Sequence, residues 1–475
     1  MAVGVATVAE DLRAVFSTGK TRSYEWRASQ LKALEKVATC HDKELAEALY
    51  SDLRKPEHEA FVFEIAGVAK ACKFALKELR RWMKPEKVKT SMTTFPSSGE
   101  IVSEPLGAVL IISAWNYPVL LSLDPVIGAI AAGNAVVLKP SEIAPATSSA
   151  LAKLLGQYMD TSAVKVVEGG VPETTTLLEQ NWDKIFYTGN SKIGRIVMTA
   201  AAKHLTPVVL ELGGKCPAVV DSNVDLKVAA RRLAAGKFCN SGQTCVSPDY
   251  VLTSNEFAPK LINAISSEVE KFYGKDPLQS NDLARIINAR HFQRVANLLD
   301  DEKISDKIVF GGQRDKTNLK ISPTIILDAP GDSLVMGEEI FGPLLPIITV
   351  NKVEDSIPFI NAKEKPLAAY LFSSDKKLEE KFITGVSAGG MTINDTTLHL
   401  AEHGLPFGGV GESGMGAYHG KFSFDAFSHK KAVLVRSFKG DISARYPPYT
   451  TRKLNLLKAI LSGNIIRILR AIFGL

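Results

Sequence analysis

Apolar residues recur every three or four positions through much of the first eighty residues, for example across 27–53 and 60–83. This spacing places one apolar stripe along a helix, so the segment is predicted to be helical. Residues 84–105 differ, because β-branched residues, prolines and a Ser-Gly pair interrupt the pattern. That composition is typical of a β-hairpin that leaves the main body, and we expect it to be an oligomerisation arm.

From residue 107 the pattern changes to short apolar runs separated by segments of helix length. The runs lie at 108–113, 135–139, 164–169, 184–189 and 208–212. Aliphatic strands that alternate with helices indicate a parallel sheet covered on both faces, with ligands at the carboxyl ends of its strands. A second series of strands and helices begins after residue 211. We therefore predict an α/β protein with a Rossmann-type nucleotide-binding unit and a second α/β lobe.

The composition is that of a globular protein of 475 residues, 45% hydrophobic and 23% charged, with a formal net charge of +6. A chain of this length is expected to form two or three substructures. The positive charge comes with no arginine-rich run, so nucleic acid is not indicated as a partner. Five cysteines without framework spacing favour a reducing compartment, and the first twenty residues lack the features of a secretion signal. We expect a cytoplasmic protein.

The segment 453–475 is strongly aliphatic but carries Lys458 and two arginines. Burying these cations at the centre of a bilayer is costly, so a membrane span is disfavoured. The favoured interpretation is an amphipathic tail folded onto the body or onto a partner subunit. The alternative is an interfacial helix on an intracellular membrane, with Leu469, Ile472 and Phe473 at the acyl boundary.

Two glycine-containing segments are candidates for phosphate binding. Residues 409–414 match G-x-G-x-x-G but do not follow a strand, so that match is set aside. A better candidate is the turn where an apolar strand ends at Gly189 and a helix begins, with Gly194 in its first turns. A helix N-terminus offers N–H groups and positive partial charge to a pyrophosphate. A plain strand–helix turn is an equally open interpretation.

The apolar run 135–139 ends in Lys139, and Glu142 follows three residues later. Dinucleotide-binding folds place a carboxylate near this position, where it accepts a hydrogen bond from a ribose 2′-hydroxyl. Glu142 is the candidate for that role, and a solvated loop carboxylate is the alternative.

Cys239 and Cys245 lie in one stretch of small residues, GKFCNSGQTCVSPDY. A reducing compartment disfavours a disulfide between them, and a zinc site would need further thiolate or imidazole ligands at close spacing, which do not occur. Cys239 is interpreted as a buried thiol. Cys245 follows small residues that let backbone and substrate approach closely, so it is the candidate nucleophile.

Seven motifs occur in one order along the chain. They are SAWNYP with Asn116, LKPSE with Lys139, YTGNSKIGR with Gly189 and Gly194, LELGGK with Glu211, GQTCVSP with Cys245, EEIFGPLLPI with Glu339 and Phe341, and PFGGVGESGMGAYHGKFSFDAFSHKK. In this set and order the chain resembles the NAD(P)-dependent aldehyde dehydrogenases from about residue 5 to past residue 445. It is most similar to the plant members of the class 3 branch.

The resemblance implies an aldehyde dehydrogenase-like fold and a homodimer. The implied parts are an NAD-binding domain at 1–85 and 107–210, a catalytic domain at 211–400, an oligomerisation arm at 86–106 and 420–445, and a C-terminal amphipathic tail at 446–475.

The resemblance also implies a mechanism. The Cys245 thiolate would attack an aldehyde, the thiohemiacetal would give hydride to NAD, and water would hydrolyse the resulting thioester. The Asn116 amide and the Cys245 backbone N–H would hold the oxyanion, and Glu211 would take a proton from the water. We find no basic residue near Cys245 in the sequence, so we expect backbone dipoles, the cationic nicotinamide and proton removal to Glu211 or water to favour the thiolate.

The cofactor contacts that the resemblance implies are Trp115, Lys139, Glu142, Gly189, Gly194, Glu339 and Phe341. A carboxylate at position 142 would repel a 2′-phosphate, so NAD is expected to be preferred over NADP. No metal is expected.

The expected activity is oxidation of medium- or long-chain aliphatic or aromatic aldehydes to carboxylic acids, in aldehyde detoxification and stress response. The alternative is a non-redox cysteine hydrolase or acyltransferase, which would need an imidazole base. The histidines at 204, 399, 403, 419 and 429 lie in no recognisable dyad motif, and such an enzyme would leave the cofactor motifs unexplained.

Overall fold

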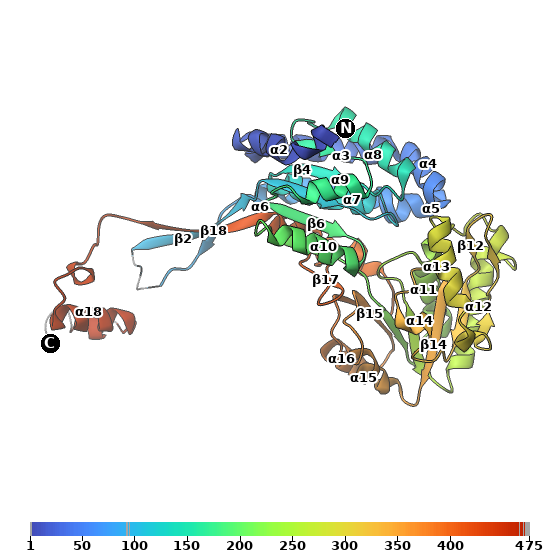
Figure 1. Cartoon of the computed structure of the whole chain (residues 1–475). Helices are drawn as coiled ribbons and strands as arrows, with labels where there is room; N and C mark the ends of the chain where they lie inside the picture. The colour runs from blue at the N-terminus through green and yellow to red at the C-terminus, as the bar shows by residue number, and fades with distance from the viewer. Residues whose placement is uncertain (1, 92–93, 95, 465, 469, 471–475) are drawn as a thin grey trace. The chain divides into compact units, whose positions relative to one another are not determined.

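The computed structural model describes residues 2–91, 94, 96–464, 466–468 and 470. The chain divides into two compact units, one made of residues 1–79 and 105–427 and the other of residues 80–104 and 428–475 (Figure 1). The first unit contains two large sheets, and the second contains a three-stranded sheet.

A six-stranded sheet has the order β17-β7-β6-β3-β4-β5. Its strands are β3 (Ala108–Ile112), β4 (Ala135–Lys139), β5 (Val164–Val166), β6 (Lys184–Thr188), β7 (Val208–Glu211) and β17 (Gly414–Met415). All neighbours are parallel except β17, which pairs antiparallel with β7. Every residue of β3, β4 and β6 is buried, as expected of parallel strands covered on both faces. The apolar runs of the sequence therefore form the centre of this sheet.

Helices from the first two hundred residues cover this sheet. On one face, α2 (Val8–Ser17), α9 (Val171–Leu178) and α10 (Ser191–Ala202) share a core with alternate residues of the strands. A further helix, α7 (Leu120–Ala132), contacts β3 and β4. Next to it, α3 (Tyr24–Cys40) contacts α7 and α8 (Pro145–Tyr158), and α4 (Asp42–Leu53) contacts α8. Other helices are α1 (Ala2–Ala6), α5 (Glu57–Ala60), a π-helical turn (Phe61–Ile65), α6 (Ala66–Trp82) and α17 (Gly420–Ala426). The helical segment predicted before residue 85 is present.

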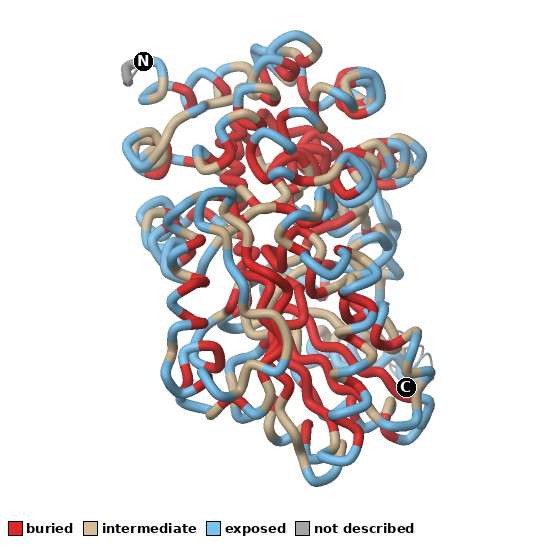
Figure 2. The backbone as a smooth tube through the Cα atoms, turned by 90° about the vertical axis from the view of Figure 1, so that its right-hand side faces the viewer, coloured by how far each residue is buried: buried red, intermediate tan, exposed pale blue. Residues whose placement is uncertain are grey.

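The second large sheet has seven strands in the order β10-β13-β14-β9-β8-β15-β16. Its strands are β8 (Pro217–Val220), β9 (Tyr250–Ser254), β10 (Ile308–Phe310), β13 (Thr324–Leu327), β14 (Leu344–Val350), β15 (Ala368–Phe372) and β16 (Gly390–Ile393). Its helices are α11 (Leu226–Phe238), α12 (Ala258–Tyr273), α13 (Ala289–Leu299), α14 (Leu334–Gly337), α15 (Ser356–Asn361) and α16 (Lys376–Gly385). In the chain between β10 and β13 lies a short two-stranded ribbon, β11 (Arg314–Asp315) with β12 (Lys320–Ile321). Figure 2 shows that buried residues follow the strands, while exposed residues lie on the outer helices and loops.

The second unit contains the predicted hairpin. β1 (Glu86–Val88) pairs antiparallel with β2 (Ser97–Pro105), and β18 (Ser428–Arg436) is the third strand, next to β2. Toward the C-terminus α18 spans Thr451–Leu461. Within the described residues, none of the helices has the length and apolar character needed to traverse a bilayer. The three residues predicted at an acyl boundary, Leu469, Ile472 and Phe473, lie outside the described residues.

Candidate active site

Three of the predicted site residues lie at or just beyond the carboxyl ends of parallel strands. β7 ends at Glu211, β4 ends at Lys139, and Asn116 follows shortly after β3. Thr188, the last residue of β6, pairs in register with Glu211. Because the strands are parallel, these ends meet along one edge of the sheet, which is where α/β proteins bind their ligands.

Cys245 follows a loop whose backbone is left-handed at three consecutive residues. After α11, Asn240, Ser241 and Gly242 have φ angles of 52°, 52° and 71°. Each non-glycine residue in this conformation costs about 1 to 2 kcal/mol, so the loop persists only because its surroundings hold it. Gly242 is required by its neighbour as well, since a Cβ at this position would lie 2.3 Å from the Gly342 carbonyl oxygen.

Hydrogen bonds join the loop after β3 to the cysteine loop. Asn116 Nδ2 donates to the Gln243 carbonyl oxygen at 3.1 Å. The Tyr117 hydroxyl oxygen lies 2.8 Å from that of Thr244. The structure therefore brings Asn116 against the residues that immediately precede Cys245.

A buried ion pair, Lys55 with Glu64, holds the backbone of the loop that carries Asn116. Lys55 Nζ contacts Glu64 Oε1 at 2.5 Å and donates to the Asn116 carbonyl oxygen at 3.1 Å. The other carboxylate oxygen of Glu64 accepts from the backbone N–H groups of Val119 and Leu120, next to the start of α7. Sequence reasoning missed this pair, because no local pattern connects a lysine and a glutamate to a carbonyl group about sixty positions away.

The thiol and the two carboxyl groups near it favour their neutral forms. Burial raises the pKa of the Cys245 thiol to about 12, and the nearby carboxyls of Glu339 and Glu211 add to the rise. Glu211 is 2% exposed, and neither of its carboxyl oxygens has a hydrogen-bond partner among the described residues. Burial holds the pKa of Glu211 well above its usual range. The thiol therefore needs a proton acceptor when it reacts, and the nearby Glu211 can act as one in its ionised form.

Lys237 corrects the expectation that no basic residue lies near Cys245 in the sequence. It belongs to the same stretch, on α11, and is fully buried. Its Nζ has no hydrogen-bond partner within the described part of the chain. Burial lowers the pKa of Lys237 to about 8, partly offset by the carboxyls of Asp249 and Glu339. A lysine three residues before the loop could have been noticed from the sequence, but its burial could not.

Lys139 and Glu142 form a pair at the carboxyl end of β4. Lys139 is buried at the end of β4, and its Nζ contacts Glu142 Oε2 and the Pro140 carbonyl oxygen, both at 2.8 Å. The Glu142 side chain is 45% exposed. A buried cation paired with a partly exposed carboxylate is suited to the hydroxyl groups of a ribose.

The turn after β6 begins a capped helix. Asn190 Oδ1 accepts from the Ile193 backbone N–H at 3.0 Å, which caps the N-terminus of α10. A Cβ on Gly194 would lie 2.9 Å from Leu212 Cδ2, so this glycine allows α10 to pack closely on the segment after β7. Gly189 lies directly after β6, at the same edge as Glu211.

Glu339 lies against the backbone that follows Glu211. A Cβ on Gly213 would fall 2.2 Å from Glu339 Oε2, and the Gly214 N–H donates to that carboxyl. Burial, with a contribution from the Asp249 carboxylate, raises the pKa of Glu339 to about 8. Lys215 forms an ion pair with Asp249 and donates to the Glu338 carbonyl oxygen at 2.9 Å, which fixes the segment before Phe341.

Trp115 and Phe341 form an aromatic group with His291, which sequence reasoning did not single out. The Trp115 ring lies 5.4 Å from Phe341 and 4.7 Å from His291 between ring centroids. Phe341 has a φ angle of 47°, so its backbone is held in a left-handed conformation. The predicted contacts thus fall into a polar pair at Lys139 and Glu142 and an aromatic group beside Glu339.

The residues at the strand ends fit a dinucleotide. Thr188 Oγ1 is buried without a hydrogen-bond partner among the described residues, at the edge where the capped N-terminus of α10 opens. The buried carboxyl of Glu211 is likewise unpartnered. Buried polar groups left unsatisfied are uncommon and mark places where a ligand or water completes the hydrogen bonding. Lys139, Glu142, Gly189 and Glu339 would then hold NAD(P).

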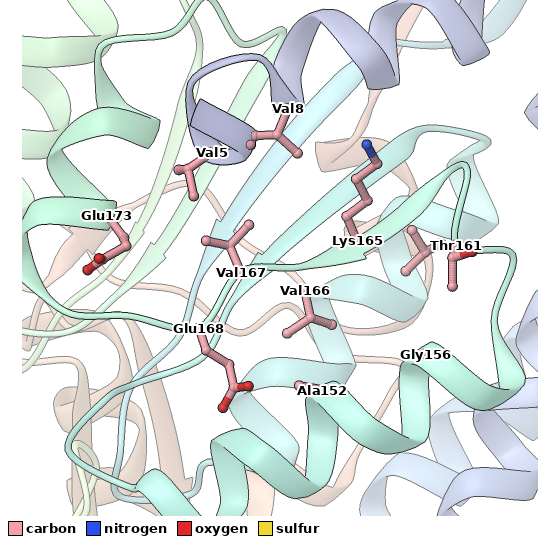
Figure 3. Close-up of a pocket in the computed structure, with 12 residues that line it drawn as sticks. Val5, Val8, Ala152, Gly156, Thr161, Lys165, Val166, Val167, Glu168 and Glu173 are labelled. Carbon is pink, nitrogen blue, oxygen red and sulfur yellow. The ribbon is translucent and has the colours of Figure 1, made fainter. Parts of the chain in front are cut away.

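A cavity of about 570 Å³ lies apart from these residues, beside β5 of the six-stranded sheet (Figure 3). It is lined by Val5 and Val8 from the N-terminal helices, by Val166 and Val167 at β5, and by Glu173. None of the predicted site residues lines it. Its Glu173 is engaged with the chain itself, because Oε2 accepts from the Gly170 N–H at 2.8 Å.

A family model described as the aldehyde dehydrogenase family matches residues 4–433. The chain belongs to the aldehyde dehydrogenase family. It is therefore an NAD(P)-dependent oxidoreductase that converts aldehydes to carboxylic acids, as predicted. The non-redox cysteine hydrolase is not favoured.

Three relatives illustrate the range within this family. An aldehyde dehydrogenase from Craterostigma plantagineum is 68% identical over 468 residues, covering 98% of each chain. Aldehyde dehydrogenase family 3 member H1 from Arabidopsis thaliana is 64% identical over 466 residues, covering 98% of this chain and 96% of the relative. A Canis lupus familiaris enzyme named aldehyde dehydrogenase, dimeric NADP-preferring, is 47% identical over 446 residues, covering 94% and 98%. The predicted similarity to plant members of the class 3 branch is confirmed.

A solved structure gives the same result for the fold. The substrate-bound state of Staphylococcus aureus AldH is similar with a TM-score of 0.93 and 43% identity, covering 96% of this chain and 99% of that one. The predicted fold class, an aldehyde dehydrogenase-like α/β protein, is confirmed.

Proposed function

We propose that this aldehyde dehydrogenase works through a covalent bond to Cys245, with Asn116 holding the oxyanion and Glu211 activating water. The observation that carries this proposal is that Asn116 and Glu211, at one edge of the six-stranded sheet, both lie near the cysteine loop. Asn116 bonds to the residue two before Cys245, and the Glu211 carboxyl is close enough to the thiol to raise its pKa.

In the first step the Cys245 thiol loses its proton and its sulfur bonds to the aldehyde carbon. The raised pKa of the thiol means that the proton must be accepted nearby, by water or by the Glu211 carboxylate. The carbonyl oxygen becomes an oxyanion, which accepts hydrogen bonds from Asn116 Nδ2 and the Cys245 backbone N–H. NAD(P), which Lys139, Glu142, Gly189 and Glu339 would hold, would supply the hydride acceptor.

The second step is hydrolysis of the thioester on Cys245. Glu211, once any proton taken in the first step has passed to solvent, draws a proton from water, which attacks the acyl carbon. The C–S bond breaks, the acid leaves, and the Cys245 sulfur leaves as thiolate. A general base works best when its pKa lies near the working pH, and burial moves the pKa of Glu211 in that direction. The absence of a bound partner for Glu211 among the described residues leaves both oxygens free to bind that water.

We propose NAD as the preferred cofactor. The exposed Glu142 carboxylate lies 2.8 Å from Lys139 Nζ, and a 2′-phosphate at this point would meet a negative charge. The Canis lupus familiaris relative is named NADP-preferring, so the preference must be measured. Equal or better kcat/KM with NADP would contradict the proposal.

We propose medium- or long-chain aliphatic or aromatic aldehydes as substrates, in a cytoplasmic detoxification and stress role. Rates of NADH formation across a series of aldehydes of increasing chain length test the substrate class. For the domains, we assign NAD binding to residues 1–85 and 107–210, and catalysis to residues 211–400. The proposed oligomerisation arm is 86–106 with 420–445.

We propose that the enzyme is a homodimer formed through the sheet β1-β2-β18. β18 is an edge strand of that sheet, with Leu434 and Val435 each 57% exposed. An exposed strand edge with apolar side chains is a template for pairing with another chain. Sedimentation analysis should give a dimer for the native chain and a monomer after Val435→Lys.

Peripheral membrane contact is a further proposal for the tail. Residues 428–475 carry ten lysines and arginines against the single acid Asp441. Exposed Tyr449, Leu454 and Leu461 accompany this charge. Basic and apolar side chains together favour an anionic bilayer surface. Sedimentation with phosphatidylserine vesicles, absent with neutral vesicles, would support this contact.

A further inference from the structure

Asn240 lies at the centre of the contacts between the oxyanion residue and the cysteine loop. Its side chain is fully buried. Its amide nitrogen Nδ2 donates to the Asn116 carbonyl oxygen at 2.9 Å and to the Gln243 carbonyl oxygen at 3.1 Å. One amide group therefore binds both segments on which the proposed oxyanion site is built.

The chemistry of the neighbours fixes which way this amide points. Both groups facing it are carbonyl oxygens, which only accept hydrogen bonds, so only the NH₂ end can face them. Turning the amide by 180° would set Asn240 Oδ1 against two acceptors. In the observed orientation Oδ1 has no partner among the described residues, and a buried orphan acceptor is a cost of about 1 to 3 kcal/mol. The observed orientation therefore keeps the two hydrogen bonds of Asn240 Nδ2 and leaves Oδ1 unpaired among the described residues.

The Gln243 carbonyl oxygen also accepts a hydrogen bond from the Asn116 side-chain amide, the proposed oxyanion donor. Asn116 Nδ2 donates to it at 3.1 Å, next to the bond from Asn240. An amide NH₂ group carries two hydrogens, so one is used by Gln243 and one remains for an oxyanion. The direction of that second hydrogen depends on where the Gln243 carbonyl points, and Asn240 holds this carbonyl.

The backbone of Asn240 is fixed from the opposite side. Its N–H donates to Glu59 Oε2 at 2.9 Å, and its carbonyl oxygen accepts from Gln243 Nε2 at 3.0 Å. The residue has a φ angle of 52°, which asparagine tolerates better than most side chains. Asn240 is thus held at both ends while its side chain reaches the Asn116 peptide.

We propose that Asn240 is a positioning residue for aldehyde oxidation, which aims the Asn116 amide at the oxyanion by binding the Asn116 and Gln243 carbonyl oxygens together. This inference rests on the oxyanion role of Asn116 proposed above. Asn240 does not touch the substrate, so its effect must disappear when no oxyanion forms.

The test compares two reactions of Cys245 in Asn240→Gly, in the full-length enzyme. Glycine adopts the left-handed backbone without strain, so this variant removes only the side chain. The pre-steady-state burst of NADH with an aldehyde should slow by about 10- to 100-fold, because misplacement of a catalytic group by about 1 Å costs up to this much. Alkylation of Cys245 by iodoacetamide forms no oxyanion, and its rate should change by less than about 3-fold. Equal slowing of both reactions would overturn the inference.

Ser241→Gly is the matched control. Ser241 has the same φ angle and is also buried, but its hydroxyl donates to the Ala284 carbonyl oxygen and not to the oxyanion segments. Both variants place a glycine in the same loop, so both add the same backbone freedom. The burst in Ser241→Gly should stay within about 3-fold of the native enzyme. A loss as large as that of Asn240→Gly would show loop flexibility instead of positioning and would overturn the inference.

Combination with Asn116→Ala separates this inference from the proposed function. If Asn240 acts through Asn116, adding Asn240→Gly to Asn116→Ala should slow the burst little further, whereas independent effects would multiply. Multiplying effects would overturn the inference. An unchanged burst in Asn116→Ala alone would overturn the oxyanion role and the inference with it. A slow burst in Asn116→Ala beside a native burst in Asn240→Gly would overturn the inference only.

Discussion

Two glutamates of the first unit follow strands of the same parallel sheet but lie in opposite environments. Glu142, after β4, has a side chain that is 45% exposed and is paired with Lys139. Glu211, at the end of β7, is 2% exposed and has no hydrogen-bond partner among the described residues. The first carboxylate is solvated and partnered before any ligand arrives, whereas the second is kept dry and unsatisfied.

The contrast separates a group that binds from a group that reacts. A solvated carboxylate can exchange a water for a ribose hydroxyl with little change in its charge state. Desolvation raises the pKa of a carboxyl, so its ionised form is a stronger base and can take up a proton during the reaction near neutral pH. This contrast supports the proposed roles, cofactor contact for the first and proton transfer for the second, and the following variants test this division.

The largest effect is expected from Cys245→Ala. Removing the nucleophile should lower kcat by at least about 10⁴-fold, since other covalent enzymes lose this much when their nucleophile is deleted. NADH formation with an aldehyde is the measurement, and NAD binding by calorimetry is the control that should be unchanged. Turnover that survives in this variant would remove the covalent mechanism.

Glu211→Gln should lower kcat by about 10²- to 10⁴-fold, the range of general base catalysis. The acyl group should remain on Cys245, because thioester formation needs less help than its hydrolysis. Intact-mass analysis after one turnover should show the acylated chain. Glu142→Gln is the matched control, since it removes a carboxylate from the same sheet without blocking hydrolysis. A Glu211→Gln enzyme that releases acid at the native rate would end the distinction between the two glutamates.

The pH dependence of thioester hydrolysis gives a smaller effect with a definite sign. Glu211 acts as a carboxylate, and burial raises its pKa, so hydrolysis should slow as pH falls through that raised pKa and should recover above it. Single-turnover acid release measured against pH tests this. The acidic limb should be missing from the residual activity of Glu211→Gln, and its survival there would assign the titration to another group.

Glu142→Ala should have the smallest effect. The carboxylate is exposed, so losing its hydrogen bonds to a ribose should raise KM for NAD by only about 2- to 10-fold. KM for NADP should rise less or fall, because the repulsion of a 2′-phosphate is removed. Steady-state kinetics with both cofactors measure this. A fall in kcat without a change in either KM would show that Glu142 serves catalysis and would erase the contrast.

The strands could be predicted from the sequence, and the residues proposed to react could be singled out, for a physical reason. Runs such as 108–113 are apolar because parallel strands are covered on both faces, and the motifs around Cys245 and Glu211 are local in the chain. The contacts of Asn240 could not be predicted, since Asn116 lies 124 positions away and only the fold brings the two together. The burial of Lys237 was hidden for the same reason: neighbours distant in the chain surround it.

The close approach of Gly242 to the Gly342 carbonyl oxygen couples two parts of the enzyme that protein engineers would treat separately. Residues 339–341, next to Gly342, include two of the proposed cofactor contacts. With no room between these two backbones, any displacement there is transmitted to the residue three places ahead of the nucleophile. Libraries built at that segment should therefore be screened for thiol reactivity as well as for cofactor binding.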